Sequence, residues 1–128
     1  MKSKQVIVIR KDLNMRKGKI VAQGSHASMK VIFDMMTQHP EGKSLFLAPD
    51  SPEKDWIEGI FTKICVSVDS EKELMDIYDS AVKSGLNTAI ITDSGLTEFG
   101  GVPTKTAVAI GPNWDSEIDV ITGHLKLL

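Results

Sequence analysis

The segment MRKGKIVAQGSHASMK, residues 15–30, organises the rest of this chain. Small and apolar residues recur through it and just beyond it at helical spacing: Ile20, Gly24, Ala27, Val31 and Met35. This spacing predicts a helix with one apolar face that packs against a β-sheet. Gly24 and Ala27 would let the helix backbone approach the sheet closely, although glycine inside a helix costs about 1 kcal/mol relative to alanine.

A polar stripe lies about 100° away around the same predicted helix. It consists of Lys19, Gln23, His26 and Lys30, and it is preceded by Arg16 and Lys17. Most polar stripes are solvated faces that mix acids with bases. Here no acid occurs between Lys17 and Lys30, which favours a binding or catalytic surface over a face that is only solvated.

The composition is ordinary for a globular protein, with 128 residues, 41% hydrophobic and 25% charged. We expect one domain over residues 1–128, because a chain of this length can bury a single sizeable core. It contains no apolar run of membrane-spanning length and no signal-peptide pattern, so no membrane partner is expected. The single cysteine, Cys65, is expected to be a packed thiol in a reducing compartment, and we predict a cytoplasmic location.

The charge is distributed unevenly, although the net charge of −2 would by itself argue against nucleic acid. Residues 1–30 hold eight of the 15 basic residues and only one of the 17 acidic residues, Asp12. A local basic field attracts a polyanion whatever the net charge. The alternative is that acids from elsewhere in the chain neutralise these bases in the folded protein.

Strand and helix signals alternate along the chain. Strands are predicted at residues 4–10, 61–68, 86–92 and 106–110, and helices at about 15–37, 53–57 and 71–84 and after Asn113. This order predicts an α/β fold with three layers, Rossmann-like, around a four-stranded sheet. The last two strands are joined by a glycine-rich loop without a helix, so they should be antiparallel and the sheet mixed.

Side chains that cap helices are expected at several boundaries. Asn14 or Asp12 should cap the first helix, Ser70 opens a capping box, and Asn113 should cap the last helix. Residues 38–60 are the least regular part of the chain. Trp56, in the short helix within that segment, is interpreted as an anchor packed on the body of the protein.

The turn Asp93-Ser-Gly-Leu-Thr97 follows the third predicted strand. Ligands of open α/β sheets gather at such strand ends, where the basic start of the first helix should also lie. Free N–H groups at that helix start suit a phosphate or carboxylate. Asp93 is expected to be partly desolvated and able to act as a general base on water, whereas the alternative is an ordinary turn aspartate.

Other catalytic signatures are missing from the sequence. His26, His39 and His124 do not have metal-ligand spacing. No phosphate-binding loop, serine-nucleophile motif or dinucleotide-binding glycine motif occurs in the expected context. Thr97, Thr104 and Thr106 could donate hydrogen bonds, but threonines near strands usually satisfy the backbone.

Six motifs taken together resemble the type 2 peptidyl-tRNA hydrolase family. They are KQVIVIRKDL (4–13), KGKIVAQ (17–23), SHA (25–27), DSGLT (93–97), AIGP (109–112) and VITGHL (120–125). The resemblance implies a mixed four-stranded sheet flanked by helices, in proteins that are often homodimers. It also implies hydrolysis of the ester that joins a peptide to the 3′ end of tRNA, with peptidyl-tRNA as partner and with no metal or organic cofactor.

The resemblance also implies site residues. By position, the functional residues of the family fall on Lys19, Gln23, His26, Asp93, Thr97 and Thr106, with Thr104 as the alternative to Thr106. On this hypothesis Lys19 stabilises charge on the ester carbonyl, and Asp93 orients or deprotonates the attacking water. Phosphates of the tRNA would be bound, without reading of sequence, by Lys11, Arg16, Lys17 and Lys30.

One departure from the family pattern affects the predicted chemistry. Glu98 replaces the usual glutamine after Thr97, and a second acid near Asp93 would raise the pKa of one of the two. This departure leaves an alternative function open, a non-catalytic RNA- or protein-binding module on the same fold. A nucleotide-dependent Rossmann-like enzyme is a third reading, which the missing glycine motif disfavours.

Overall fold

The computed structural model describes residues 1–96 and 98–128 and is an α/β structure with a mixed sheet. The strands of this sheet are β1 (Ser3–Arg10), β4 (Lys63–Val68), β5 (Thr88–Asp93), β6 (Thr104–Trp114) and β7 (Lys126–Leu127). The helices are α1 (Lys17–Met35), α2 (Pro52–Glu58), α3 (Glu71–Lys83) and α4 (Asp115–Thr122), and a 3₁₀ turn, η1 (Lys11–Leu13), follows β1. The predicted α/β class is confirmed.

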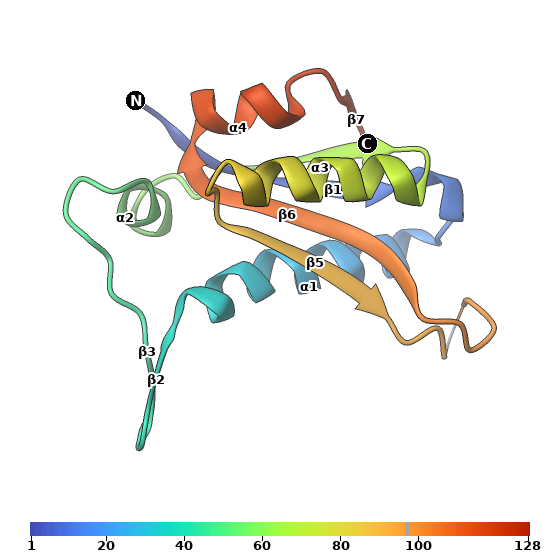
Figure 1. Ribbon diagram of the computed structural model, residues 1–128, viewed down its shortest axis with the longest axis horizontal. Helices are drawn as coiled ribbons and strands as arrows, with labels where there is room; N and C mark the ends of the chain where they lie inside the picture. Colours follow the sequence, from blue (N-terminus) through green and yellow to red (C-terminus); the bar gives the residue numbers. More distant parts are fainter. Residues whose placement is uncertain (97) are drawn as a thin grey trace.

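The strand order is β5-β6-β1-β4-β7 (Figure 1). β1 and β4 are parallel, whereas β6 is antiparallel to both of its neighbours, β1 and β5. The predicted mixed sheet and the antiparallel pairing across the glycine-rich loop are therefore confirmed. The predicted number of four strands is wrong, because the short strand β7 pairs with β4 as a fifth. A two-residue pairing gives too little periodicity to be predicted from sequence.

Strand β1 is buried from both sides, as its continuous β-branched run suggests. Val6 and Val8 pack in a cluster with residues of α3 and α4, and Ile7 and Ile9 pack in a second cluster with residues of α1. Figure 1 shows α3 and α4 on one side of the sheet and α1 on the other. Burying each of these side chains contributes about 1.5–3 kcal/mol to the stability of the fold. Because β1 supplies residues to both clusters, it is the centre of the core.

Helix α1 packs on the sheet through the predicted apolar stripe. Gly24, Ala27 and Val31 are buried, and the stripe residues nearer to its two ends are partly buried. The predicted cap is wrong, because the N-cap residue is Arg16 and it makes no side-chain capping bond. The turn η1 intervenes before the helix, and Asn14 ends that turn in a left-handed conformation, with φ of 51°.

The other predicted caps have different outcomes. The Ser70 hydroxyl accepts a hydrogen bond from the Glu73 N–H at 3.0 Å, which confirms the cap of α3. Asn113 does not cap α4, because it belongs to β6 and its side-chain oxygen accepts the N–H of Asn87 at 2.9 Å. Cys65 is exposed rather than packed.

The segment after α1 forms a hairpin that was not predicted. Its strands are β2 (Thr37–His39) and β3 (Gly42–Ser44), every residue of both is exposed, and the hairpin projects from the body of the protein (Figure 1). Trp56 of α2 is buried and its indole N–H donates to the Thr62 carbonyl at 2.7 Å, which confirms its role as an anchor. None of the helices in the described part of the chain is long and apolar enough to cross a membrane.

Candidate active site

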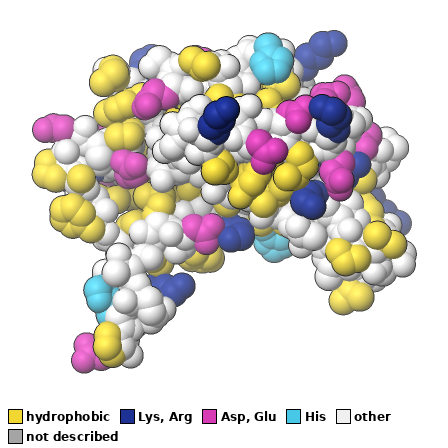
Figure 2. Space-filling view, viewed as in Figure 1, with side chains coloured by type: hydrophobic (Ala, Val, Ile, Leu, Met, Phe, Trp, Pro, Cys, Tyr) yellow, Lys and Arg dark blue, Asp and Glu magenta, His cyan; other side chains and the backbone are white. Residues whose placement is uncertain are grey.

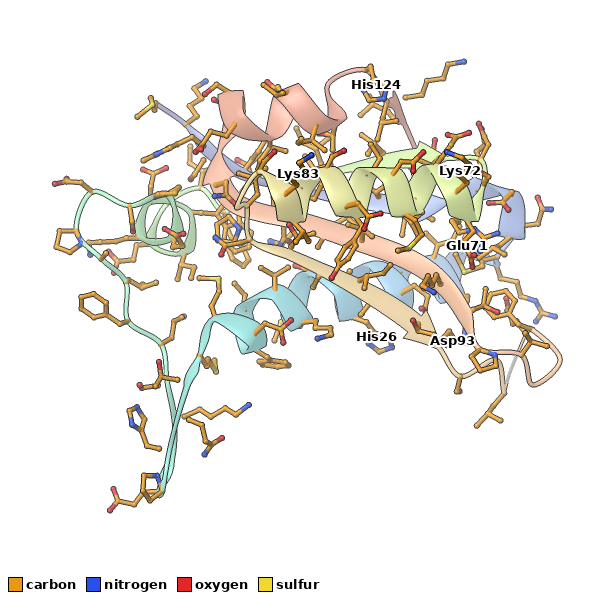
Figure 3. All side chains as sticks on the ribbon, viewed as in Figure 1. His26, Glu71, Lys72, Lys83, Asp93 and His124 are labelled. Carbon is orange, nitrogen blue, oxygen red and sulfur yellow. The ribbon has the colours of Figure 1, made fainter. Side chains whose placement is uncertain are left out.

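The carboxyl end of β5 meets the first turns of α1, and the two strongest site candidates touch there. The Lys19 ammonium lies 2.9 Å from Asp93 Oδ1, although 74 residues separate them in sequence. Their side chains are 14% and 13% exposed, respectively, so the pair is mostly buried but still reached by solvent. Figure 3 shows Asp93 at the end of β5 and His26 on α1.

Two more donors hold the Asp93 carboxylate. The Gln23 amide donates to Oδ1 at 3.2 Å, and the Gly95 N–H donates to Oδ2 at 2.9 Å. Gly95 has φ of 81°, and a side chain there would place its Cβ in steric overlap with the Val102 carbonyl oxygen. Only glycine therefore fits at the turn that aims this N–H at the carboxylate.

Thr106 is joined to this group through Gln23. Its hydroxyl, which is fully buried, donates to Gln23 Oε1. The amide NH₂ of Gln23 then faces Asp93, because its oxygen accepts from the threonine. The Thr106 hydroxyl, the Gln23 amide, the Asp93 carboxylate and the Lys19 ammonium thus form one continuous chain of hydrogen bonds.

A β-bulge explains why Thr106 points to α1. The pairs Ile91–Ala107 and Thr92–Lys105 leave Thr106 as an extra, unpaired residue of β6. Strict alternation would direct its side chain away from Ala107, to the opposite face of the sheet. A bulge re-aims a side chain, and here it turns Thr106 to the face that α1 covers.

The pKa of the Asp93 carboxyl lies below its usual value. The hydrogen bond from Lys19 is the largest cause, followed by the Gly95 N–H, and both outweigh the opposing effect of burial. Asp93 is thus partly desolvated, as expected, but its hydrogen-bond donors have the larger effect on its pKa. Glu98 is not among the causes of this shift, and its carboxylate lies 3.8 Å from the Arg16 guanidinium.

The remaining predicted site residues lie around this centre. His26 is exposed and is one helical turn beyond Gln23. Thr104 is the cross-strand partner of Asp93, and its hydroxyl donates to the Val102 carbonyl at 2.8 Å. Thr97 lies outside the described residues. The site also contains Phe99, which sequence reasoning missed; the Lys19 ammonium lies 5.6 Å from its ring centroid.

The four predicted phosphate-binding residues are exposed, and they differ in their partners. Arg16, 90% exposed, faces Glu98, and Lys30 forms an ion pair with Asp34 at 3.0 Å. For Lys11 and Lys17, the described part of the chain places no carboxylate within salt-bridge distance. Acids from elsewhere therefore neutralise only part of the basic N-terminal segment.

Metal ligands do not gather in the described residues, where no three His, Cys, Asp or Glu side chains are grouped as a metal site requires. The donors of the Lys19–Asp93 centre are an ammonium, an amide, a hydroxyl and a backbone N–H. These groups suit a carboxylate, a developing oxyanion or a water molecule.

Fold and site together define a class of mixed-sheet α/β proteins with a solvent-accessible ammonium–carboxylate pair between the first helix and the end of an edge strand. The chain belongs to the family described as Peptidyl-tRNA hydrolase PTH2, whose model matches residues 3–128. The resemblance found in its motifs is thereby confirmed.

Individual relatives agree with the family match. A peptidyl-tRNA hydrolase of Methanocaldococcus jannaschii is 46% identical over 125 residues, which cover 98% of this chain and 99% of the relative. Peptidyl-tRNA hydrolases of Haloquadratum walsbyi and Thermococcus onnurineus are 40% and 37% identical, with 97% and 98% of this chain covered, and 98% and 97% of the relatives. Their similarity extends over the whole fold and not only over its motifs.

Proposed function

We propose that this chain hydrolyses the ester bond of peptidyl-tRNA, or of an N-blocked aminoacyl-tRNA, and releases free tRNA and peptide. Membership of the family supports this function. The observation that carries it is the contact between Lys19 and Asp93, since a positive charge near the developing oxyanion and a group that holds the attacking water both accelerate ester hydrolysis.

Lys19 stabilises the negative charge that develops on the ester carbonyl oxygen. Asp93 orients the attacking water. A carboxylate has about four acceptor positions, and the described donors use three of them, which leaves one on Oδ2 for that water. Because the pKa of Asp93 is lowered, the group is ionised at neutral pH and is a weak base, so orienting water is its main role.

Gln23 and Thr106 are positioning residues in this mechanism. Thr106 is fully buried, so we assign it an action through Gln23 rather than contact with the ester or ribose. His26, exposed on the same side of α1, is our candidate to protonate the departing ribose oxygen. Thr97, which follows β5 in sequence, and Thr104, the first residue of β6, would position the ester or the ribose.

The tRNA partner would be bound through its phosphates by the basic residues around the start of α1 and by Lys30. Lys17, at the start of α1, and Lys11, in the preceding turn η1, are both exposed. Contacts of this kind add affinity that does not depend on the RNA sequence and that decreases as the salt concentration rises. They would place the acceptor end of the tRNA at Lys19.

We infer that the chain forms a single domain with three α/β/α layers, because its two core clusters lie on opposite sides of β1. We also propose a cytoplasmic location, a homodimer, and catalysis without a metal or organic cofactor. Sedimentation analysis tests the homodimer.

The deciding experiment measures release of tRNA from a purified N-acetylated aminoacyl-tRNA. Hydrolysis by the wild-type chain, strongly reduced by Asp93→Asn, is the expected result. Binding of the RNA without hydrolysis would instead favour the alternative, a non-catalytic binding module on the same fold.

A further inference from the structure

We propose that the free edge of β5 binds the peptide part of the substrate as an added, parallel strand. This inference rests on the proposed function and concerns the same site. It assigns a subsite for an extended peptide backbone to residues 88–92, which the catalytic proposal does not use.

The first observation is the place of β5 in the sheet. It is the last strand of the order, and among the described residues it pairs only with β6. In Figure 1 it lies below β6, at the lower edge of the sheet, between α3 and α1. One row of its N–H and C=O groups is therefore available to another extended chain.

The register identifies the groups in that row. The Gly111 N–H donates to the Asn87 carbonyl at 2.8 Å, which marks residues 87 and 111 as a hydrogen-bonded pair. Such pairs alternate along an antiparallel ladder, so Ala89 and Ile91 bond to β6. The N–H and C=O groups of Thr88, Ile90 and Thr92 consequently point to the free edge.

The second observation is that Asp93 is the last residue of this edge strand. Hydrolysis at the Lys19–Asp93 pair requires the ester carbonyl, and hence the C-terminal residue of the peptide, to lie beside it. A peptide that runs back from there along β5 has the same direction as β5. At about 3.3 Å per residue, the six residues of β5 can pair with roughly six residues of peptide.

Main-chain hydrogen bonds suit this substrate because they are the same for every peptide sequence. The flanks of the edge are also suited to varied side chains. Phe33 lies 14 residues after Lys19, which places both side chains on the same side of α1, and Phe33 is 49% exposed. Figure 2 shows hydrophobic side chains at the surface between α3 and β5.

The first test compares tRNAs that carry N-acetylated peptides of one, three, six and nine residues. We expect kcat/KM to rise about tenfold from one to six residues, as hydrogen bonds are added along the edge. It should then level off, because β5 is six residues long. Peptides with different side chains at the second to sixth positions should give similar values.

A proline variant tests the subsite directly. Thr88→Pro removes an N–H that points to the free edge, and edge strands tolerate proline at such positions. The ratio of kcat/KM for the six-residue over the three-residue substrate should fall to near one. Thr88→Val keeps the N–H and should restore that ratio.

Amide hydrogen exchange provides a second measurement that does not depend on folding of the proline variant. In Asp93→Asn bound to a six-residue peptidyl-tRNA, the amides of Thr88 and Ile90 should become protected at least about tenfold. Ala89 and Ile91 serve as internal controls, because their amides already bond to β6.

Equal kcat/KM for all peptide lengths, or unprotected amides at Thr88 and Ile90 in the complex, would overturn the edge proposal while leaving the hydrolase proposal intact. Failure to hydrolyse even the one-residue substrate would instead overturn the proposed function on which it rests.

Discussion

The two flanks of α1 present opposite chemistry, although they belong to one helix. On the flank that faces β5 and β6, Lys19 and Gln23 join Asp93 and Thr106 in a chain of hydrogen bonds. The flank that faces β4 lines an apolar groove of about 460 Å³. Its lining includes Val21, Met29, Phe61, Lys63 and Cys65.

The difference shows that chemically capable residues do not make a site by themselves. Lys63 is a cation and Cys65 is a thiol, and both are exposed. Lys63 lies over the aromatic rings of Phe61 and Trp56, and no described residue places a carboxylate within salt-bridge distance of it. Partial burial lowers the pKa of Lys63. On the other flank, a bulge, a turn and a helix converge, and they supply hydrogen-bond partners for Lys19, Gln23, Asp93 and Thr106.

The largest expected effect is the loss of activity in Lys19→Ala and Asp93→Asn. Each should reduce turnover of a model peptidyl-tRNA by at least about tenfold, or roughly 1.4 kcal/mol of barrier, because each removes half of the pair. Lys63→Ala, on the opposite flank, is the matched control and should retain activity. Near-native turnover in both site variants would defeat the assignment.

Thr106→Val should lower stability, because it leaves the buried oxygen of Gln23 without its donor. A loss of about 1–3 kcal/mol in the free energy of unfolding is expected, measured by urea denaturation. Thr104→Val is the control, since its hydroxyl only donates to a nearby exposed carbonyl. Equal losses in the two variants would argue against a special role for the bulged threonine.

Arg16→Ala should weaken tRNA binding by removing one phosphate contact. The slope of log K against log salt should decrease in magnitude by about one, as measured by filter binding over a salt series. Lys63→Ala removes the same charge from the groove flank and should leave the slope unchanged. A change of slope in the Lys63→Ala variant would indicate that the RNA contacts the groove side of α1 instead.

Gly24→Ala, between the two flanks, should raise stability by about 0.5–1 kcal/mol. A Cβ at this position would lie 3.5 Å from Ile7 Cγ2, which is an ordinary van der Waals distance, so the close approach of α1 does not require glycine there. Thermal unfolding measures the gain. A lower melting temperature would show that the helix sits closer to the sheet than these contacts indicate.

The smallest effect concerns acid stability. Because the folded-state pKa of Asp93 is lowered, its pairing stabilises the fold fully above the unfolded-state pKa of about 3.9 and loses this effect as pH falls through the folded value. The difference in unfolding free energy between wild type and Asp93→Asn should thus be constant from about pH 5 to 7 and shrink below about pH 4. A difference that instead shrinks near pH 6 would indicate a raised pKa.

Sequence by itself determined the parts of this protein that depend on local pattern. The stripe from Ile20 to Met35 encodes α1 and its buried face, and the β-branched run of β1 encodes a strand covered on both sides. The capping box at Ser70 encodes the start of α3. These features follow from periodicity and turn chemistry within a few residues. The same reasoning singled out the candidate site residues, and motif resemblance favoured Lys19 and Asp93 among them.

Only the tertiary structure decided how those residues work together. Strand register decides four features that the sequence did not show. These are the bulge at Thr106, the contact of Lys19 with Asp93, the exposure of Cys65 and the place of Asn113 in β6 instead of at a helix cap. The pKa of Asp93 also depends on tertiary contacts. Hydrogen-bond donors from α1 and from the turn after β5 lower this pKa by more than burial raises it. Register and long-range contact are set by the packing of the whole chain, which no local pattern contains.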